Sequence, residues 1–556
     1  MRTVFLRCHF LCFFLIVAGG IQPSTGHAQN FPALSVTIED SAATEGYYFL
    51  TPYTSSFLSS YDHAQLILDK FGRIIFYRII AKDVNLTPTI DFKLQPNGWM
   101  SYFNTNRSAH FIMDSTFTVI DSIRCSNGFE TDQHDLQILP GNHYLFFGNE
   151  MRIMDLTSYH YFGFNHTSPG GANAQVSGVV IQEFNENKEL VWEWKAHDHY
   201  QFGDVDPVWL LNPNKVDWTH ANAVEKDQDG NILVSLRHFN EITKIGYSTG
   251  NILWRLGGKQ NQFTFPNDPI RFTGQHDIRR VSETSVSLFD NGQYTNPPMS
   301  RALEYSLDES NKIATLAWEY IYDSSMYSVA CGNHQYIENG NHLVDFGFPN
   351  VANFPWMVVV KPDKSKILEI GFPDGYISYR AFNYPALPWQ LNRPNIECRK
   401  IGSDYYLVAE PGHSEYRWST GDTTSSIPIA DEGDYWVFVP YGSGYLSSEH
   451  MTITDVTNPC LMSGAPSEDI ITGISLRTLP NPANGHARIL FHLPSDSQVI
   501  ISLGNLMGVE VLQYEKRSYP AGNHEIMMDI SSLTRGIYFL TMLVNDKRIA
   551  GKLIIR

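Results

Sequence analysis

The sequence of 556 residues lacks several patterns that mark common classes of protein. It contains no Cys-x-x-Cys pair, which argues against a thiolate zinc site. It has neither a P-loop nor a Gly-x-Gly-x-x-Gly fingerprint, so no nucleotide-binding loop is expected. Basic residues are in deficit, because 40 Lys and Arg stand against 58 Asp and Glu. The resulting net charge of −18 is poorly suited to binding nucleic acid or an anionic membrane surface.

Long apolar runs are absent after the N-terminal segment. Arg2 and Arg7 precede an apolar run from Phe10 to Ala18, and a small-x-small site follows at residues 26–28. This order predicts a signal peptide over residues 1–28. The run is too short for a membrane helix, which takes about 20 apolar residues. We therefore expect an exported protein without an integral membrane span.

Cysteine is scarce, and two of the six cysteines lie within the predicted signal peptide. Export places the other four in a compartment that permits disulfides. Cys398 and Cys460 bracket one small module of the chain, and we predict that they form a disulfide. Cys125 and Cys331 remain unassigned.

Aromatic residues are abundant at 13%, and Gly and Pro punctuate the whole chain. This composition favours short strands and tight turns. Two half-motifs alternate, one typified by His134–Gly148 and the other by Ile242–Trp254. Paired, they give six units that start near residues 46, 90, 134, 220, 276 and 334, the first with a truncated inner strand. Each unit supplies about four strands, so the repeat predicts an all-β six-bladed β-propeller over residues 30–385. Two consecutive β-sandwiches are the alternative.

Two further modules are expected after the propeller. Prolines at 385, 388 and 394 indicate a linker. Residues 395–460 read as a small immunoglobulin-like β-sandwich, and a second linker at 463–470 precedes a third module over residues 472–556. We expect this third module to be a β-sandwich as well.

Histidines begin four of the six units. They are His134, His220, His276 and His334. In a propeller the first strand of each blade lines the central channel, so these rings are expected to converge. Arg237 lies on a neighbouring strand, and its planar fork can bind sulfate, phosphate or carboxylate through two bonds. Asn222 shares a strand face with His220, because side chains alternate with a period of two. Asp135 and Asp277 are expected to be structural.

These residues resemble the arylsulfate sulfotransferase family. The resemblance covers residues 33–385 and rests on Asp217–Asn222, Ser235–His238, Gly274–Asp277 and Ser287–Gly292. It implies a propeller with a central site that moves a sulfuryl group from an aryl sulfate to a phenol. No metal, nucleotide donor or other cofactor is implied.

The resemblance also implies roles for individual residues. His276 corresponds to the transiently sulfated histidine, and His134 and His220 correspond to supporting histidines. Arg237 corresponds to the family's arginine. Asn222 and His334 are expected to contact substrate, although the family gives His334 no role.

The last module resembles the C-terminal sorting domain of the type IX secretion system of Bacteroidetes. The resemblance rests on Leu479–Ala483, Gly508, Asp529–Phe539 and Lys552–Arg556. It implies passage through the periplasm and across the outer membrane, with the type IX machinery as partner.

Two other functions stay open at this point. Convergent histidines also suit a divalent metal, as in a polysaccharide lyase. A non-catalytic surface propeller that binds glycans or proteins is the third possibility.

Overall fold

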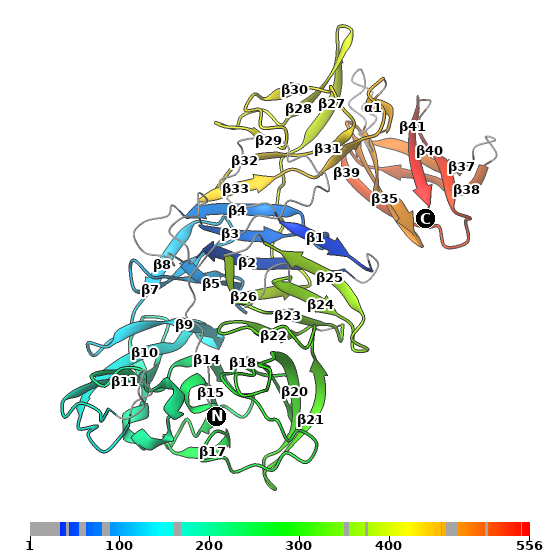
Figure 1. Cartoon of the computed structure of the whole chain (residues 1–556). Helices are drawn as coiled ribbons and strands as arrows, with labels where there is room; N and C mark the ends of the chain where they lie inside the picture. The colour runs from blue at the N-terminus through cyan, green and yellow to red at the C-terminus, as the bar shows by residue number, and fades with distance from the viewer. Residues whose placement is uncertain are drawn as a thin grey trace, which may run out of the picture.

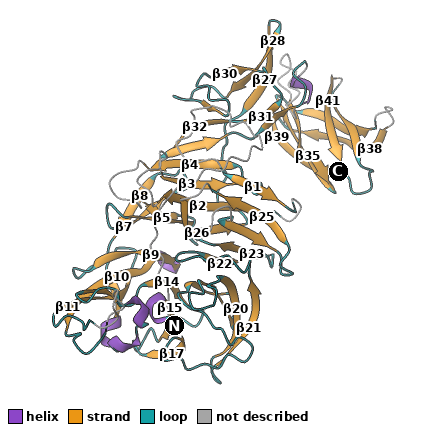
Figure 2. Cartoon of the chain, in the orientation of Figure 1, coloured by secondary structure: helices purple, strands orange, loops and turns teal. Residues whose placement is uncertain are grey.

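Strands make up nearly all of the regular structure (Figures 1 and 2). A computed structural model describes residues 34–40, 44–54, 63–80, 89–160, 168–337, 339–349, 355–372, 376–457, 459–462, 475–505, 510–545 and 547–555. The predicted signal peptide and the linker at 463–470 lie outside the described residues. Within them α1 (Pro459–Met462) is the only α-helix, and no helix there is long and apolar enough to cross a membrane.

The described residues between 35 and 384 form six mainly antiparallel sheets. From the innermost strand outward, the first contains β26 (Tyr376–Tyr384), β2 (Tyr47–Thr54), β3 (His63–Leu68) and β4 (Ile74–Ile80). The second contains β5 (Thr89–Leu94), β6 (Met100–Asn104), β7 (Ala109–Met113) and β8 (Val119–Ile123). The third contains β9 (Glu130–Leu139), β10 (His143–Met154), β11 (Ala174–Phe184) and β12 (Leu190–Lys195), with β13 (Lys215–Asp217) beside β11.

The other three sheets follow the same plan. The fourth contains β14 (Ala221–Lys226), β15 (Ile232–Leu236), β16 (Glu241–Ile245) and β17 (Ile252–Gly257). The fifth contains β18 (His276–Arg280), β19 (Ser285–Asp290), β20 (Arg301–Asp308) and β21 (Ile313–Tyr320). The sixth contains β22 (Asn333–Tyr336), β23 (His342–Asp345), β24 (Met357–Val360), β25 (Lys366–Gly371) and β1 (Ser35–Ile38).

The six sheets are arranged as a propeller. Their innermost strands touch in a closed cycle that runs β26, β5, β9, β14, β18, β22 and back to β26. Middle strands such as β15 and β16 are buried on both faces, because a neighbouring sheet covers each side. The all-β propeller expected from the repeats is thus present in the fold.

Side chains of the innermost strands also join one sheet to the next. Four side chains, in or directly after such a strand, accept a hydrogen bond from a backbone N–H of the neighbouring innermost strand. The acceptors are Gln95, Gln137, Glu225 and Gln335, at N···O distances of 3.0, 3.1, 2.9 and 2.7 Å. A polar position repeated along the inner strands therefore helps to hold the channel wall together.

The ring is closed by both ends of this segment. The first unit was expected to have a truncated inner strand, but the structure completes its sheet with β26, which pairs with β2 (Leu50↔Ala381). In the sixth sheet β1 pairs with β25 (Val36↔Ile370). Backbone hydrogen bonds between distant segments thus join the beginning and the end of the propeller.

The next module is built onto the propeller. A three-stranded sheet holds β27 (Ile396–Ile401), β28 (Asp404–Ala409) and β30 (Ser426–Pro428), and β31 (Gly433–Tyr435) pairs with β34 (Met451–Ile453). The strands β29 (Arg417–Trp418), β32 (Val437–Tyr441) and β33 (Gly444–Ser447) instead extend the first sheet, because β33 pairs with β4 (Leu446↔Phe76). Figure 1 shows yellow β33 beside blue β4. A disulfide joins Cys398 to Cys460 across this module.

The C-terminal module is a seven-stranded β-structure. In sheet order it contains β38 (Glu510–Tyr519), β37 (Ser497–Gly504), β40 (Gly536–Val544), β41 (Lys547–Ile555), β35 (Ser475–Asn484), β36 (His486–Leu493) and β39 (Gly522–Asp529). Burial alternates along β36 and β37, as expected for strands with one face on a core. Its core is separate from those of the propeller.

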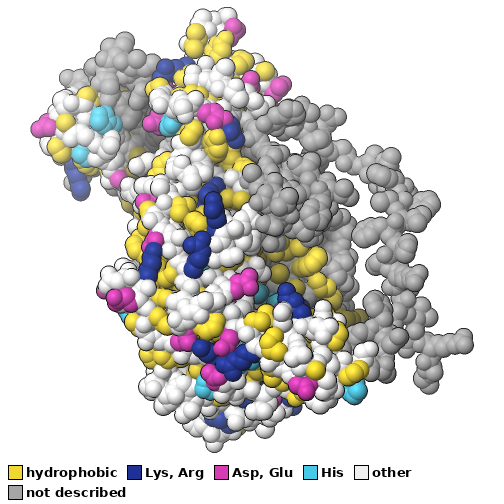
Figure 3. Space-filling view, turned by 90° about the vertical axis from the view of Figure 1, so that its left-hand side faces the viewer, with side chains coloured by type: hydrophobic (Ala, Val, Ile, Leu, Met, Phe, Trp, Pro, Cys, Tyr) yellow, Lys and Arg dark blue, Asp and Glu magenta, His cyan; other side chains and the backbone are white. Residues whose placement is uncertain are grey.

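The described residues coloured in Figure 3 form no large area of one charge sign. Lys and Arg side chains lie interspersed with Asp and Glu among many uncharged side chains. A face of this kind produces no strong single-signed field that would attract a polyanion.

Candidate active site

Three of the four predicted histidines meet at the inner edges of their sheets. His134 lies in β9, His220 directly precedes β14, and His276 opens β18. The rings of His134 and His220 are 4.9 Å apart between centroids, in an edge-to-face arrangement. His276 is close enough for charge on either ring to lower its pKa. Residues from three separate repeats therefore form one cluster.

Two of these histidines are each bonded to a carboxylate through Nδ1. The Nδ1 atom of His134 lies 2.6 Å from Oδ1 of Asp132, and a second oxygen of Asp132 accepts from Asn149. The Nδ1 atom of His220 lies 2.5 Å from Oδ2 of Asp217. In both rings Nε2 is left for other partners. The His220 side chain keeps 25% of its surface accessible, so a ligand can reach it.

His276 has neutral partners. Its Nδ1 lies 2.7 Å from Oδ1 of Asn291 and 3.1 Å from the carbonyl oxygen of Gly274. The backbone N–H of Cys331 points at Nε2 with an N···N distance of 3.3 Å, which is long for a hydrogen bond. The ring is buried, and this set of contacts identifies Nε2 as the atom with the lone pair.

The pKa values of the three rings are driven apart by these surroundings. Burial lowers the pKa of His276 well below its ordinary value, and the positive charge of Arg237 lowers it further. Burial also lowers the pKa of His220 and outweighs its carboxylate partner. At His134 burial acts in the same direction, but the Asp132 carboxylate prevails and the pKa is raised. One ring thus stays neutral while another readily holds a proton.

Arg237 is a buried cation beside this cluster. It opens the 3-10 turn η5 (Arg237–Phe239), one residue after β15, and its backbone N–H donates to the carbonyl of His220 at 3.1 Å. One terminal nitrogen donates to the carbonyl of Val329 at 2.9 Å, and the other lies 3.4 Å from Nε2 of His238. The guanidinium stacks 4.1 Å over the ring of Trp209.

The charge of Arg237 is not neutralised by the protein. Among the described residues no carboxylate lies within ion-pair distance of its guanidinium, and its buried Nε has no hydrogen-bond partner there. Burial lowers the pKa of Arg237, as expected for a cation taken out of water. A side chain in this state is a receptor for an anion.

Cys331 is a site residue that the sequence left unassigned. Asn333 binds the backbone N–H and carbonyl of Ala381 through its amide, as Asn222 binds the next sheet. His220 lies two residues before Asn222, and Cys331 lies two residues before Asn333. Both have positive φ angles, of 44° and 65°. Cys331 therefore occupies the histidine position of the sixth unit. Burial raises the pKa of its thiol to about 12, so the thiol is neutral.

Asn222 is part of the wall of the site. Its Nδ2 donates to the carbonyl of Gln275 at 2.7 Å, and its Oδ1 accepts from the N–H of Asp277 at 3.4 Å. Its own carbonyl accepts from the Tyr379 hydroxyl and from Arg380. The structure thus places Asn222 between the fourth and fifth sheets with both amide atoms engaged, instead of presenting a free amide to a substrate.

His334 lies apart from the other three histidines. Its Nδ1 is 3.1 Å from the carbonyl oxygen of Leu303, and its Nε2 is 2.9 Å from Nδ1 of His342. The ring is fully buried and stacks on Trp318. The side chain of Asn333 faces the next sheet and binds it. Because side chains alternate along a strand, the next residue, His334, faces the opposite side. The predicted convergence of four histidines is corrected to three.

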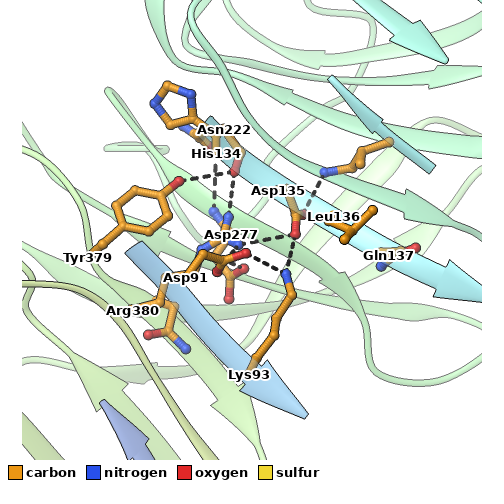
Figure 4. A network of polar contacts seen from close by, with 12 residues as sticks. Asp91, Lys93, His134, Asp135, Leu136, Gln137, Asn222, Asp277, Tyr379 and Arg380 are labelled. Atoms are coloured by element: carbon orange, nitrogen blue, oxygen red, sulfur yellow. Dashed lines mark hydrogen bonds and ion pairs between the residues drawn. The ribbon is translucent and has the colours of Figure 1, made fainter. Parts of the chain in front are cut away.

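A charged network fills the channel next to the site (Figure 4). It contains three acidic and three basic side chains, all mostly buried: Asp91, Lys93, Asp135, Asp277, Arg279 and Arg380. Lys93 bonds to Asp91 at 2.7 Å and to Asp135 at 2.6 Å. The charges balance, so the network needs no external ion. Asp135 and Asp277, expected to be structural, belong to it.

One group in the site offers possible metal ligands. Atoms of Asp217, His220 and His238 lie within 4.8 Å of one another. Nδ1 of His220 already bonds to the Asp217 carboxylate. Arg237 lies against the remaining ring, 3.4 Å from Nε2 of His238. A cation placed here would face that guanidinium, so the group is poorly suited to a divalent metal.

Comparison with known proteins gives two family matches. A family model described as Arylsulfotransferase (ASST) matches residues 35–380. A model described as secretion system C-terminal sorting domain matches residues 478–556. No curated protein matches the chain. The second match supports export by the type IX machinery across the outer membrane, to the cell surface or the extracellular space.

Two solved structures that match this chain are of low similarity to it. A protein of unknown function from Bacteroides caccae is 11% identical, with a TM-score of 0.37 over 61% of this chain and 98% of that one. A catalytically inactive variant of virginiamycin B lyase from Staphylococcus aureus, solved with quinupristin, is 11% identical, with a TM-score of 0.27 over 61% of this chain and all of that one. Both TM-scores are below 0.5, so neither likeness extends to function.

Proposed function

The chain belongs to the arylsulfotransferase family, and we propose that it moves a sulfuryl group from an aryl sulfate to a phenolic acceptor. The family match over residues 35–380 supports a sulfotransferase-like function. The proposal adds the classes of donor and acceptor, and a covalent intermediate on His276.

The observation that carries this proposal is the unpaired charge of Arg237. A buried guanidinium without a carboxylate partner is costly unless an anion completes its contacts. Arg237 and His220 both lie close enough to His276 for their charges to lower its pKa. A sulfate ester carries one negative charge shared by three terminal oxygens, which fits a guanidinium.

In the first half-reaction His276 acts as the nucleophile. Its Nε2 lone pair attacks sulfur, so an N–S bond forms while the S–O bond to the donor aryl group breaks. The leaving phenolate takes a proton from His134, which the Asp132 carboxylate keeps available. The products are a free phenol and a sulfuryl group on His276.

The second half-reaction reverses these roles. The acceptor phenol gives its proton to His134, which the first step left neutral. The acceptor oxygen then attacks sulfur, the N–S bond breaks, and its electron pair returns to Nε2 of His276. The sum is transfer of one sulfuryl group between two phenols, with no change in oxidation state.

Charge on the transferring group is held by fixed donors. Sulfuryl transfer resembles phosphoryl transfer in placing negative charge on the equatorial oxygens. Arg237 is the donor for these oxygens, and His220 adds a second N–H donor when its ring is protonated, because the proton of the neutral ring lies on Nδ1 and faces Asp217. The backbone N–H of Cys331 borders the same space, 3.3 Å from Nε2 of His276. Preorganised donors of this kind lower the barrier because they need no rearrangement during the reaction.

A turnover assay tests this function. The purified protein is mixed with 4-nitrophenyl sulfate and a phenol, and both 4-nitrophenol and the new aryl sulfate are quantified. Production of both in equal amounts, unchanged by a chelator, supports the proposal. Release of 4-nitrophenol without a sulfated acceptor would contradict it. Loss of activity on chelation would favour metal-dependent chemistry at Asp217, His220 and His238.

A further inference from the structure

The Nδ1 partners of the three site histidines differ in charge. His134 and His220 each face a carboxylate. His276 faces the amide oxygen of Asn291 at 2.7 Å. A carboxylate strongly favours a positively charged ring, whereas a neutral amide oxygen does so only weakly. At His276 burial and the charge of Arg237 outweigh the Asn291 hydrogen bond, so the pKa stays low.

The orientation of the Asn291 amide is set by its other bonds. Its Nδ2 donates to the carbonyl of Ser328 at 3.0 Å and to the carbonyl of Cys331 at 3.1 Å. Both neighbours are acceptors only, so Oδ1 must point towards His276. The proton of the neutral His276 ring therefore lies on Nδ1, and Nε2 keeps its lone pair.

We infer that Asn291 is a positioning residue that fixes the proton of the neutral His276 ring on Nδ1 and leaves the lone pair on Nε2, while Asp132 makes His134 the ring that carries the proton. This assignment of roles to His276 and His134 rests on the proposed function. It explains how neighbouring imidazoles can act as nucleophile and as acid in one step, because burial, nearby charge and the Nδ1 partner together set the protonation state of each ring.

The remaining groups around each ring act in the same sense. The charged or titratable groups that influence His276 are Arg237, His220 and His134, all of which disfavour a proton on it. Those that influence His134 are the carboxylates of Asp132 and Asp217, which favour a proton, and Arg380, which opposes it. Tyr379 packs edge-to-face on His134 with centroids 5.8 Å apart.

Exchange of amide and carboxylate at two positions tests the assignment. In Asn291→Asp a carboxylate faces His276, so the acid limb of the kcat/KM profile should move to higher pH by about 1 unit or more. In Asp132→Asn the proton donor is weakened, and the loss should depend on the leaving group. Transfer from phenyl sulfate should fall about 100-fold, and transfer from 4-nitrophenyl sulfate much less, because 4-nitrophenolate needs little help from an acid.

A control variant and a measurement without substrate test whether the effect is specific to His276. Asn251→Asp adds the same charge at the exposed turn between β16 and β17 and should leave the pH profile unchanged. Nitrogen NMR of labelled histidine, with the His276 signals identified by a His276→Gln variant, reads the tautomer and protonation of that ring without any substrate. Neutral, Nδ1-protonated His276 in the wild type and a higher pKa in Asn291→Asp are expected.

The failure of this inference differs from failure of the proposed function. If the wild type transfers sulfuryl groups but Asn291→Asp moves neither the pH profile nor the NMR titration, the role of Asn291 is wrong. If Asp132→Asn lowers transfer from phenyl sulfate and from 4-nitrophenyl sulfate equally, the role of Asp132 is wrong. If the NMR titration shifts as expected and no sulfuryl transfer occurs in the wild type, the proposed function fails while the assignment of the ring states stands.

Discussion

At the residue scale, Arg237 supplies the one buried positive charge in the site that no carboxylate neutralises among the described residues. Its planar fork can bind two sulfuryl oxygens together, whereas a lysine offers a single point of charge. Arg237→Lys should therefore keep the positive charge and lose the binding of two sulfuryl oxygens at once. The barrier should rise by about 2–4 kcal/mol, as for a lost oxyanion donor.

The measurement is kcat/KM with 4-nitrophenyl sulfate and a phenol. Arg152→Lys is the matched control. Arg152 lies in β10, is partly exposed and pairs with Asp198. The control should keep full activity, and both variants should melt as the wild type does. An Arg237→Lys enzyme as active as the control would show that bidentate binding at Arg237 is unimportant.

The sequence could place three site histidines because they share a repeat position. It failed at His334 because one residue of register decides which face of β22 a side chain takes, and the Asn333 contact with Ala381 is visible only in three dimensions. Cys331 was missed for the same reason. Asp132 and Asp217 had a usable signal, since each lies two or three residues before a site histidine.

At the element scale, the repeated hairpins could be predicted because each carries its own turn residues and apolar pattern. The closure of the ring could not, because β26 follows the sixth unit in sequence and pairs with β2 through backbone groups that leave no pattern of their own. The pairing of β33 with β4 was missed likewise, so the module after the propeller looked separate.

The disulfide between Cys398 and Cys460 belongs to this scale. It links residues 62 apart in sequence, so in the chain-entropy model it stabilises the module by up to about 4 kcal/mol. Replacing both cysteines with alanine should lower the melting temperature of the module. Sulfuryl transfer should persist at temperatures where the module stays folded, because the disulfide is remote from the histidine cluster. Unchanged melting, or peptide mapping that finds both thiols free in the native protein, would argue against this stabilisation.

At the scale of the whole molecule, the chain joins a propeller of the arylsulfotransferase family to a C-terminal sorting domain. We propose the boundaries expected from the sequence, with the propeller at 30–385, the attached module at 395–460 and the sorting domain at 472–556. The C-terminal module has its own core, so it can be removed without exposing that of the propeller.

Deletion of residues 472–556 should strand a folded, active enzyme in the periplasm. Cell fractionation followed by the sulfuryl-transfer assay on each fraction measures this outcome. Because the sorting-domain match covers residues 478–556, a truncated protein that still reached the surface or medium would contradict the assignment of export to this module.

The central claim is that the sulfuryl group passes through His276. Enzyme mixed with aryl sulfate alone, quenched and digested, can be examined by mass spectrometry for a sulfuryl group on the peptide that contains His276. We predict this adduct in the wild type, its discharge on addition of a phenol, and the loss of adduct and turnover in His276→Ala. An active enzyme without the adduct, together with a His276→Ala variant that turns over normally, would contradict it.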